Sequence, residues 1–171
     1  ANIAPGMNRS FTAQNWPHLI PLKEWHDTVD EAGEQICLDG YTDIQGYDAD
    51  DGMVSISREN ARQAGVEKMI HFQRRDVSQL SHSKKYGFLI TNPPYGERIE
   101  EKKNLSALYG TLGERFKALD DWSLYLITAY EHTEDAIGLK AAKNRKIYNG
   151  MMKTYFYQFP GAKPPRRSTQ E

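Results

Sequence analysis

The sequence lacks the features that define several protein classes. It contains a single cysteine, Cys37, in 171 residues, which excludes a disulfide-stabilised scaffold within the chain. Its longest apolar run, 124–130, is too short to span a bilayer, so we expect no membrane partner. None of its five histidines lies four residues from another or beside Cys37, so we expect no metal site.

The sequence also lacks an excess of charge of either sign. Lys and Arg number 22 against 23 Asp and Glu, a formal net charge of −1, so the chain as a whole has no electrostatic attraction for nucleic acid. Hydrophobic residues make up 39%, which is too many for a disordered chain with so little net charge. A folded domain of ordinary size is therefore expected.

Helical and strand-like patterns alternate along this chain. Apolar residues spaced three and four apart predict helices, over 20–36, 51–64 and 105–119. Short apolar runs predict strands between them, over 44–47, 69–72, 86–91 and 123–129. Strand–helix alternation predicts an α/β fold with a mostly parallel sheet.

The C-terminal part has a different pattern. A short helix is predicted over 132–139, and Asn149-Gly150 separates two β-like runs, which indicates an antiparallel hairpin. The strand over 86–91 is nearly all apolar, so we expect it to be buried on both faces. Residues 160–171 are polar and proline-rich, and we expect a flexible tail there.

The most informative motif is Asn92-Pro93-Pro94-Tyr95, which follows a predicted strand directly. Open α/β sheets bind ligands at the carboxyl ends of their strands. The Asn92 amide oxygen and the Pro93 carbonyl can both accept hydrogen bonds from one exocyclic amine, and Tyr95 offers a flat face for a base. Such positioning would direct the nitrogen lone pair at an electrophile. The alternative is an ordinary Asn-Pro turn.

Two carboxylates also follow predicted strands. Asp48 suits a vicinal diol such as a ribose, because a carboxylate accepts two hydrogen bonds. A helix N-cap is the alternative, although Asp50 or Asp51 fits that place better. Asp76 could accept a hydrogen bond from an adenine amine, or it could be a solvated loop carboxylate.

Several segments together resemble one protein family. They are Asn2–Arg9, Gly46–Asp50, Arg58–Ala61 with Ala64–Val66, Thr91–Arg98 and Lys146–Gly150. Over nearly the whole chain they are similar to the bacterial THUMP-associated 23S rRNA guanine-N2 methyltransferases, which are often labelled N6-adenine-specific DNA methylases. The resemblance implies a Rossmann-like class I methyltransferase domain over 1–171, S-adenosyl-L-methionine as cofactor, an rRNA substrate and a cytoplasmic location.

The resemblance also implies residue roles. Asp48 would bind the cofactor ribose with Ala49 beside the adenine, and Asp76 would hold the adenine amine next to Val77. Asn92 would border both cofactor and target.

Within the tetrapeptide, the resemblance gives each residue a place in catalysis. Asn92 and Pro93 would orient the target amine, Pro94 would complete the motif, and Tyr95 would stack on the target base. A base inside a duplex would first have to be flipped out.

One family feature is missing, because no Gly-x-Gly occurs in the chain. In the family, a glycine-rich loop follows the first strand and approaches the cofactor closely. We therefore expect that the first strand and helix, and a THUMP-type RNA-binding module, precede this chain in a longer protein. The 171-residue chain alone is then expected to bind cofactor weakly and to be inactive.

The leading interpretation is methyl transfer to guanine N2 in 23S rRNA. N6-adenine methylation of DNA is the enzymatic alternative, and a catalytically inactive RNA-binding fragment is the non-enzymatic one. Small basic clusters, such as Lys143 with Arg145-Lys146, could line an RNA path, although such clusters are more often solvated faces.

Overall fold

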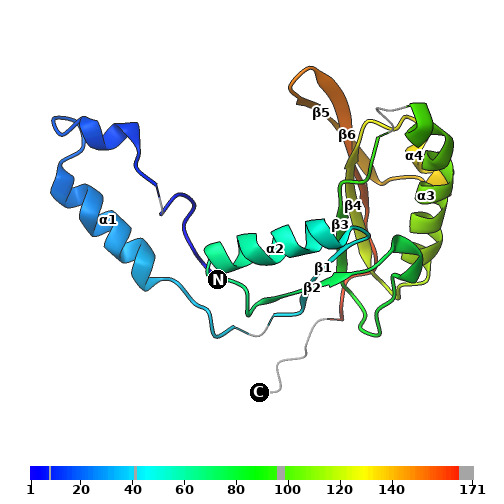
Figure 1. Cartoon of the computed structure of the whole chain (residues 1–171), viewed down its shortest axis with the longest axis horizontal. Helices are drawn as coiled ribbons and strands as arrows, with labels where there is room; N and C mark the ends of the chain where they lie inside the picture. Colours follow the sequence, from blue (N-terminus) through cyan, green and yellow to red (C-terminus); the bar gives the residue numbers. More distant parts are fainter. Residues whose placement is uncertain (8, 41, 96–98, 166–171) are drawn as a thin grey trace. The chain divides into compact units, whose positions relative to one another are not determined.

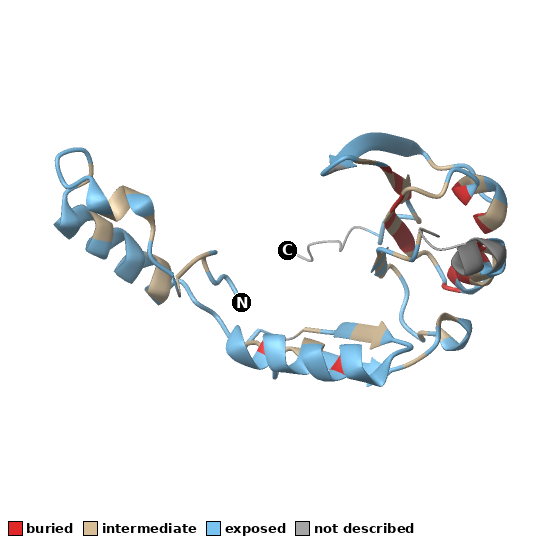
Figure 2. Cartoon of the chain, turned by 45° about the horizontal axis from the view of Figure 1, so that its top comes forward, coloured by how far each residue is buried: buried red, intermediate tan, exposed pale blue. Residues whose placement is uncertain are grey.

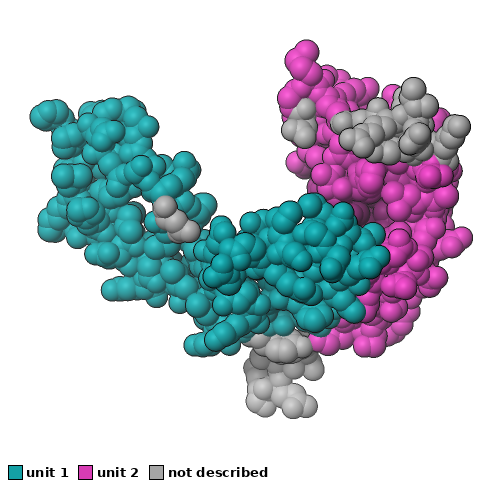
Figure 3. Space-filling model, viewed as in Figure 1, with its two compact units in different colours: residues 1–74 teal, residues 75–171 magenta. Residues whose placement is uncertain are grey.

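The structure is a computed structural model that describes residues 1–7, 9–40, 42–95 and 99–165, without the side chains of 99–103 and 149. The chain divides into two compact units, residues 1–74 and 75–171 (Figure 3). No helix in the described ranges is long and apolar enough to cross a membrane.

Unit 1 carries a two-stranded parallel sheet and its connecting helix. Its elements are η1 (Thr12–Asn15), α1 (Leu22–Glu34), β1 (Ile44–Asp48), α2 (Asp51–Gln63) and β2 (Ile70–Arg74). β1 and β2 pair from Ile44↔Ile70 to Asp48↔Arg74. Asp50 caps α2, because its carboxylate accepts hydrogen bonds from the N–H groups of Gly52 (2.6 Å) and Met53 (3.3 Å).

Unit 2 carries the larger sheet. Its elements are η2 (Val77–Gln79), β3 (Phe88–Thr91), α3 (Ile99–Lys117), β4 (Ser123–Thr128), α4 (Thr133–Ile137), β5 (Lys143–Asn149) and β6 (Met152–Phe159). The strand order is β3-β4-β6-β5 (Figure 1). β3 and β4 are parallel, whereas β6 runs antiparallel to both β4 and β5.

The hydrophobic core lies in unit 2, between one face of this sheet and the helices α3 and α4. Its members are buried apolar and aromatic side chains, namely Leu105, Tyr109, Leu112, Phe116, Leu124, Leu126, Ile137, Tyr157 and Phe159. Figure 2 shows this concentration of buried residues, whereas α2 in unit 1 contributes two. The backbones of α3 and α4 approach so closely that a Cβ on Gly113 would lie 2.4 Å from the Ile137 carbonyl oxygen.

The predicted α/β fold with parallel pairing and a C-terminal antiparallel hairpin is confirmed. Gly150 adopts φ +60° in the Asn-Gly turn, as such hairpins require. The prediction that 86–91 is buried on both faces is wrong: Phe88 is 66% and Ile90 76% exposed. Within unit 2, α3 and α4 cover only the face of the sheet opposite to Phe88 and Ile90, so one face of this nearly all-apolar strand is uncovered.

The chain after β6 is fixed at its start. The Gly161 N–H donates to the Ser123 hydroxyl at 2.9 Å. A Cβ at Gly161 would lie 2.3 Å from the Trp122 carbonyl oxygen, so only glycine fits there. Of the predicted flexible tail, residues 166–171 lie outside the described part of the chain, and the flexibility stays a prediction.

Candidate active site

The Asn92-Pro93-Pro94-Tyr95 segment leaves the sheet at the carboxyl end of β3. Pro93 and Tyr95 are half-buried, whereas Asn92 and Pro94 are exposed. The Tyr95 hydroxyl donates a hydrogen bond to Asn92 Oδ1, which closes the tetrapeptide on itself. An amide oxygen has two lone pairs, so Asn92 Oδ1 keeps one for a second donor such as an amine. Gly96–Arg98, which complete the motif, lie outside the described residues.

A network of buried hydroxyl groups on α3 and β4 holds this segment by a hydrogen bond to Pro94. The Tyr109 hydroxyl on α3 donates to the Pro94 carbonyl oxygen at 3.2 Å and lies 2.5 Å from Thr128 Oγ1 at the end of β4. Thr128 Oγ1 also accepts the Tyr130 N–H at 3.0 Å. One arrangement of protons satisfies all these bonds: Thr128 donates to Tyr109, and Tyr109 donates to Pro94.

Burial keeps the Tyr109 phenol in the donor form that this network needs. Tyr109 and Thr128 are both fully buried. Burial raises the pKa of Tyr109 to about 12, although the hydrogen bond with Thr128 opposes that shift. The phenol therefore stays protonated at neutral pH. The sequence pattern predicts only that Tyr109 belongs to the apolar face of a helix. The signal that could have marked it is its hydroxyl, which needs a hydrogen-bond partner when it is buried.

Asp76 and Val77 begin the turn η2. The Asp76 Oδ1 accepts the Ser78 N–H at 2.8 Å, so the side chain caps this turn rather than being merely solvated. Hydrogen bonds from the Ser78 hydroxyl and then its N–H lower the pKa of Asp76, which keeps the carboxylate ionised as an acceptor. Val77 packs against the core of unit 2.

Asp48 is the last residue of β1 in unit 1, and Ala49 follows it. The exposed Asp48 accepts the Asp50 N–H through Oδ1 at 2.8 Å, while Asp50 itself caps α2 as the sequence favoured. The Ala49 carbonyl accepts a hydrogen bond from Arg74 Nε at 3.1 Å, which ties the loop after β1 to the end of β2. This hydrogen bond at Oδ1 fixes the orientation of the Asp48 carboxylate, and with it the position of the second oxygen.

The structure thus brings the predicted residues together in two groups. Asn92, Pro93, Pro94 and Tyr95 form one braced segment in unit 2, which also contains Asp76 and Val77. Asp48 and Ala49 belong to unit 1. Asp48 is the last residue of β1 and Asn92 directly follows β3, whereas Asp76 lies two residues after the end of β2.

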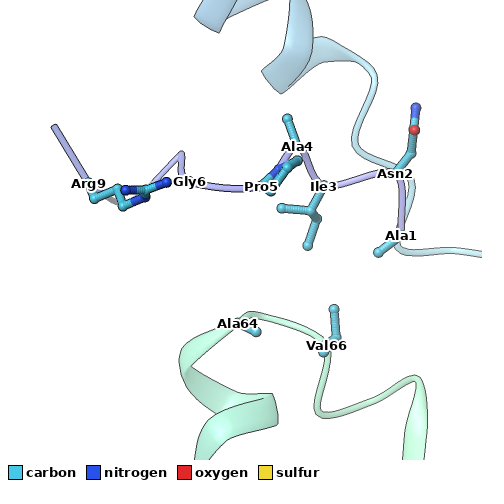
Figure 4. Close-up of a pocket in the computed structure, with 9 residues that line it drawn as sticks. All are labelled: Ala1, Asn2, Ile3, Ala4, Pro5, Gly6, Arg9, Ala64 and Val66. Atoms are coloured by element: carbon cyan, nitrogen blue, oxygen red, sulfur yellow. The ribbon is translucent and has the colours of Figure 1, made fainter. Parts of the chain in front are cut away.

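A cleft of about 650 Å³ lies elsewhere in unit 1 (Figure 4). Its walls are the N-terminal segment and the end of α2, namely Ala1–Gly6, Arg9, Ala64 and Val66. None of the predicted site residues lines it, and its walls carry no carboxylate that could hold a ribose. Among the described residues, no three His, Cys, Asp or Glu side chains gather where they could bind a metal ion.

Comparison with known proteins shows what the chain is similar to. A family model described as the RMKL-like methyltransferase domain matches residues 1–158. The chain is 39% identical over 170 residues (99% of its length) to the Bacillus subtilis (strain 168) protein named "Putative RNA methyltransferase YpsC", and covers 44% of that protein. It is 33% identical over 175 residues (99% of its length) to "Ribosomal RNA large subunit methyltransferase K/L" of Shewanella sp. (strain ANA-3), and covers 24% of it.

A solved structure extends the likeness to three dimensions. The crystal structure of "SMU.472, a putative methyltransferase complexed with SAH" superposes with a TM-score of 0.88 at 40% sequence identity. The match covers 96% of this chain and 43% of that one. The chain therefore spans less than half the length of each of these relatives.

Proposed function

Because this chain belongs to the RMKL-like methyltransferase domain family, we propose that its protein transfers a methyl group from S-adenosyl-L-methionine to an exocyclic amine of a nucleobase, namely guanine N2 in 23S rRNA. The sulfonium of this cofactor supplies the methyl group. The observation that carries the proposal is the braced Asn92–Tyr95 segment at the carboxyl end of β3.

The protein's part in the reaction is to hold the amine. Asn92 Oδ1 and the Pro93 carbonyl oxygen accept its two hydrogens, and this turns the nitrogen lone pair away from the backbone. The nitrogen acquires positive charge as its new bond to the methyl carbon forms, and these two fixed dipoles stabilise that charge. The amine then loses a proton to solvent, so no strong base is required. Tyr95 supplies the stacking face for the base.

The residues present fit the cofactor by their chemistry. Asp48 is an exposed carboxylate with one oxygen oriented by the Asp50 N–H, as a ribose diol requires. Asp76 is held ionised by Ser78 and can accept from an adenine amine, with the apolar Val77 next to it. The glycine-rich loop expected for such a site has no counterpart in this chain.

The choice of rRNA as substrate is supported by the names of the relatives and by the motif set, not by Asn-Pro-Pro-Tyr alone. The same tetrapeptide would suit an adenine N6 amine in DNA, because both amines present two hydrogens to the same acceptors.

Methyl transfer by the full-length protein tests this proposal. Labelled cofactor is incubated with 23S rRNA and with duplex DNA, and the modified nucleoside is identified by mass spectrometry after digestion. We expect N2-methylguanosine from rRNA; N6-methyladenine from DNA would replace the substrate assignment.

Asn92→Ala tests the mechanism separately. It should lower kcat by about 10²–10³-fold, since it removes one preorganised dipole at the reacting nitrogen. Asn104→Ala, at an exposed position on α3 of the same unit, is the matched control and should have little effect. Undiminished turnover by Asn92→Ala with the fold intact would mean that the amide does not hold the target.

A further inference from the structure

The near-zero net charge conceals a strong asymmetry along the chain. Residues 136–170 contain eight Lys and Arg and no Asp or Glu, whereas residues 1–135 contain fourteen basic and twenty-two acidic residues. The β5–β6 hairpin lies within the basic segment. A polyanion would therefore be attracted to this part of the protein even though the whole chain is nearly neutral.

One face of the hairpin alternates lysine and tyrosine across its two strands. Lys146 pairs with Tyr155, and the next pair on this face joins Tyr148 to Lys153. Side chains two residues apart share a face of a strand, so the four form a checkerboard. Lys146 Nζ lies 5.2 Å from the Tyr148 ring centroid, and Lys153 Nζ lies 5.1 Å from that of Tyr155. We call these four residues the Lys–Tyr platform.

Three of the four platform side chains are exposed to solvent. Both lysines are exposed and Tyr148 is 62% exposed, whereas Tyr155 is half-buried and packs against the core of unit 2. A hydrogen bond with the Tyr155 hydroxyl raises the pKa of Lys153, with a smaller contribution from Glu131. Lys140, in the same basic segment, is instead paired with Glu134 at 3.5 Å.

The strand register places the platform at the end of the sheet that Asn92 follows: Tyr155 pairs with Thr128, the last residue of β4, and the Tyr148–Lys153 pair lies two residues beyond it. Thr91, the last residue of β3, pairs with Leu126, and Leu126 pairs with Tyr157. β6 extends five residues further, to Met152, which is about 17 Å at ~3.4 Å per residue. Figure 1 shows the hairpin projecting past the ends of β3 and β4, the edge from which Asn92 follows. A nucleic-acid strand that enters the site at Asn92 would pass along this projecting hairpin.

We propose that the Lys–Tyr platform binds the unpaired RNA strand that flanks the target nucleotide, with a base stacked on the exposed Tyr148 and phosphates held by the lysines. Interleaved cations and aromatic rings are the arrangement by which proteins hold single-stranded nucleic acid. This inference rests on the proposed function for its choice of RNA. It assigns substrate binding to a part of the chain remote in sequence from Asn92–Tyr95.

Variants of the full-length protein test the platform by direct binding to an unpaired oligoribonucleotide from 23S rRNA. Tyr148→Ala should weaken binding about 5- to 150-fold, the effect of losing one stacked base. Tyr148→Phe keeps the ring and should bind like the wild type. Lys146→Gln with Lys153→Gln should make the plot of log K against log salt shallower by about 1.4, since each phosphate contact on a single strand contributes about 0.7.

The controls separate this inference from the proposed function. Lys23→Gln with Lys68→Gln removes two exposed lysines of unit 1 and should leave RNA binding unchanged. Cofactor affinity should be unchanged in all platform variants. Platform variants that still methylate RNA and that bind it with wild-type affinity and salt slope would overturn the inference. Duplex DNA that competes as well as the unpaired oligoribonucleotide would overturn the assignment to unpaired RNA. Platform-dependent RNA binding without any methyl transfer would instead refute the proposed function alone.

Discussion

Removing the Tyr109 hydroxyl tests whether the Asn92–Tyr95 segment, the proposed catalytic segment, depends on its buried hydrogen-bond partner. Tyr109→Phe keeps the ring in the core, where it contacts Tyr130 at 4.8 Å between centroids, and deletes only the oxygen. Pro94 then loses its donor, but it is exposed and water can replace the phenol. Thr128 Oγ1 has no such access, and it retains the Tyr130 N–H as its remaining partner.

The magnitude follows from these two fates. A buried hydroxyl that loses its acceptor costs about 1–2 kcal/mol of stability, in the range for a partly unsatisfied buried group. We expect a larger effect on kcat than on stability, because Pro94 lies next to the Pro93 carbonyl that we propose orients the amine. A shift of about 1 Å in such a group costs up to about 10²-fold in rate. We expect kcat to fall by about 10- to 100-fold.

Two measurements on the full-length protein check this prediction: urea unfolding and single-turnover methyl transfer with saturating RNA and cofactor. Tyr125→Phe is the matched control, because this tyrosine lies on the opposite face of β4 and its hydroxyl makes no hydrogen bond among the described contacts. A Tyr109→Phe enzyme that loses stability but keeps its full rate would refute the idea that this network positions the site. Unchanged stability would refute the network itself.

Other predictions concern packing, ionisation and cofactor binding. Gly113→Ala should destabilise the protein by about 1–3 kcal/mol, because its Cβ would meet the Ile137 carbonyl at 2.4 Å. Gly110→Ala should be tolerated, since its Cβ would lie 3.8 Å from the nearest backbone oxygen. The raised pKa of Tyr109, about 12, means that its contribution to stability is complete below pH ~10 and is lost as the pH rises towards the folded value; Tyr109→Phe should lack this alkaline loss in a pH series of unfolding curves. Asp76 has a lowered pKa, so its contribution is present at neutral pH and is lost as acid protonates it. Asp76→Ala should raise the cofactor Kd in calorimetry by about tenfold, the loss of one hydrogen bond to a charged group. The 171-residue chain alone should show no low-micromolar affinity for S-adenosyl-L-methionine, and such affinity would contradict the need for a glycine-rich loop.

Local order in this protein is readable from its sequence because short-range forces decide it. The helical spacing over 51–64 became α2, and Asp50 caps it as its side chain favours. The Asn149-Gly150 signal gave the β5–β6 turn, since few other residue pairs accept that backbone. Strand β3 shows the limit: its apolar residues indicated a strand correctly but not which of its faces is covered.

The sequence by itself determined the α/β class, the order of the elements and the motif at Asn92–Tyr95, because periodicity, turn chemistry and a contiguous tetrapeptide are local properties. Tertiary structure alone decided that β4 lies between β3 and β6, that Tyr109 reaches Pro94 across 15 residues of sequence, and that the β5–β6 hairpin extends past the ends of β3 and β4. Each of these depends on register and on the packing of a helix against a sheet. These contacts join residues that are distant in sequence and share no local pattern. They exist only once the strands are aligned and the hydroxyls are buried in the folded chain.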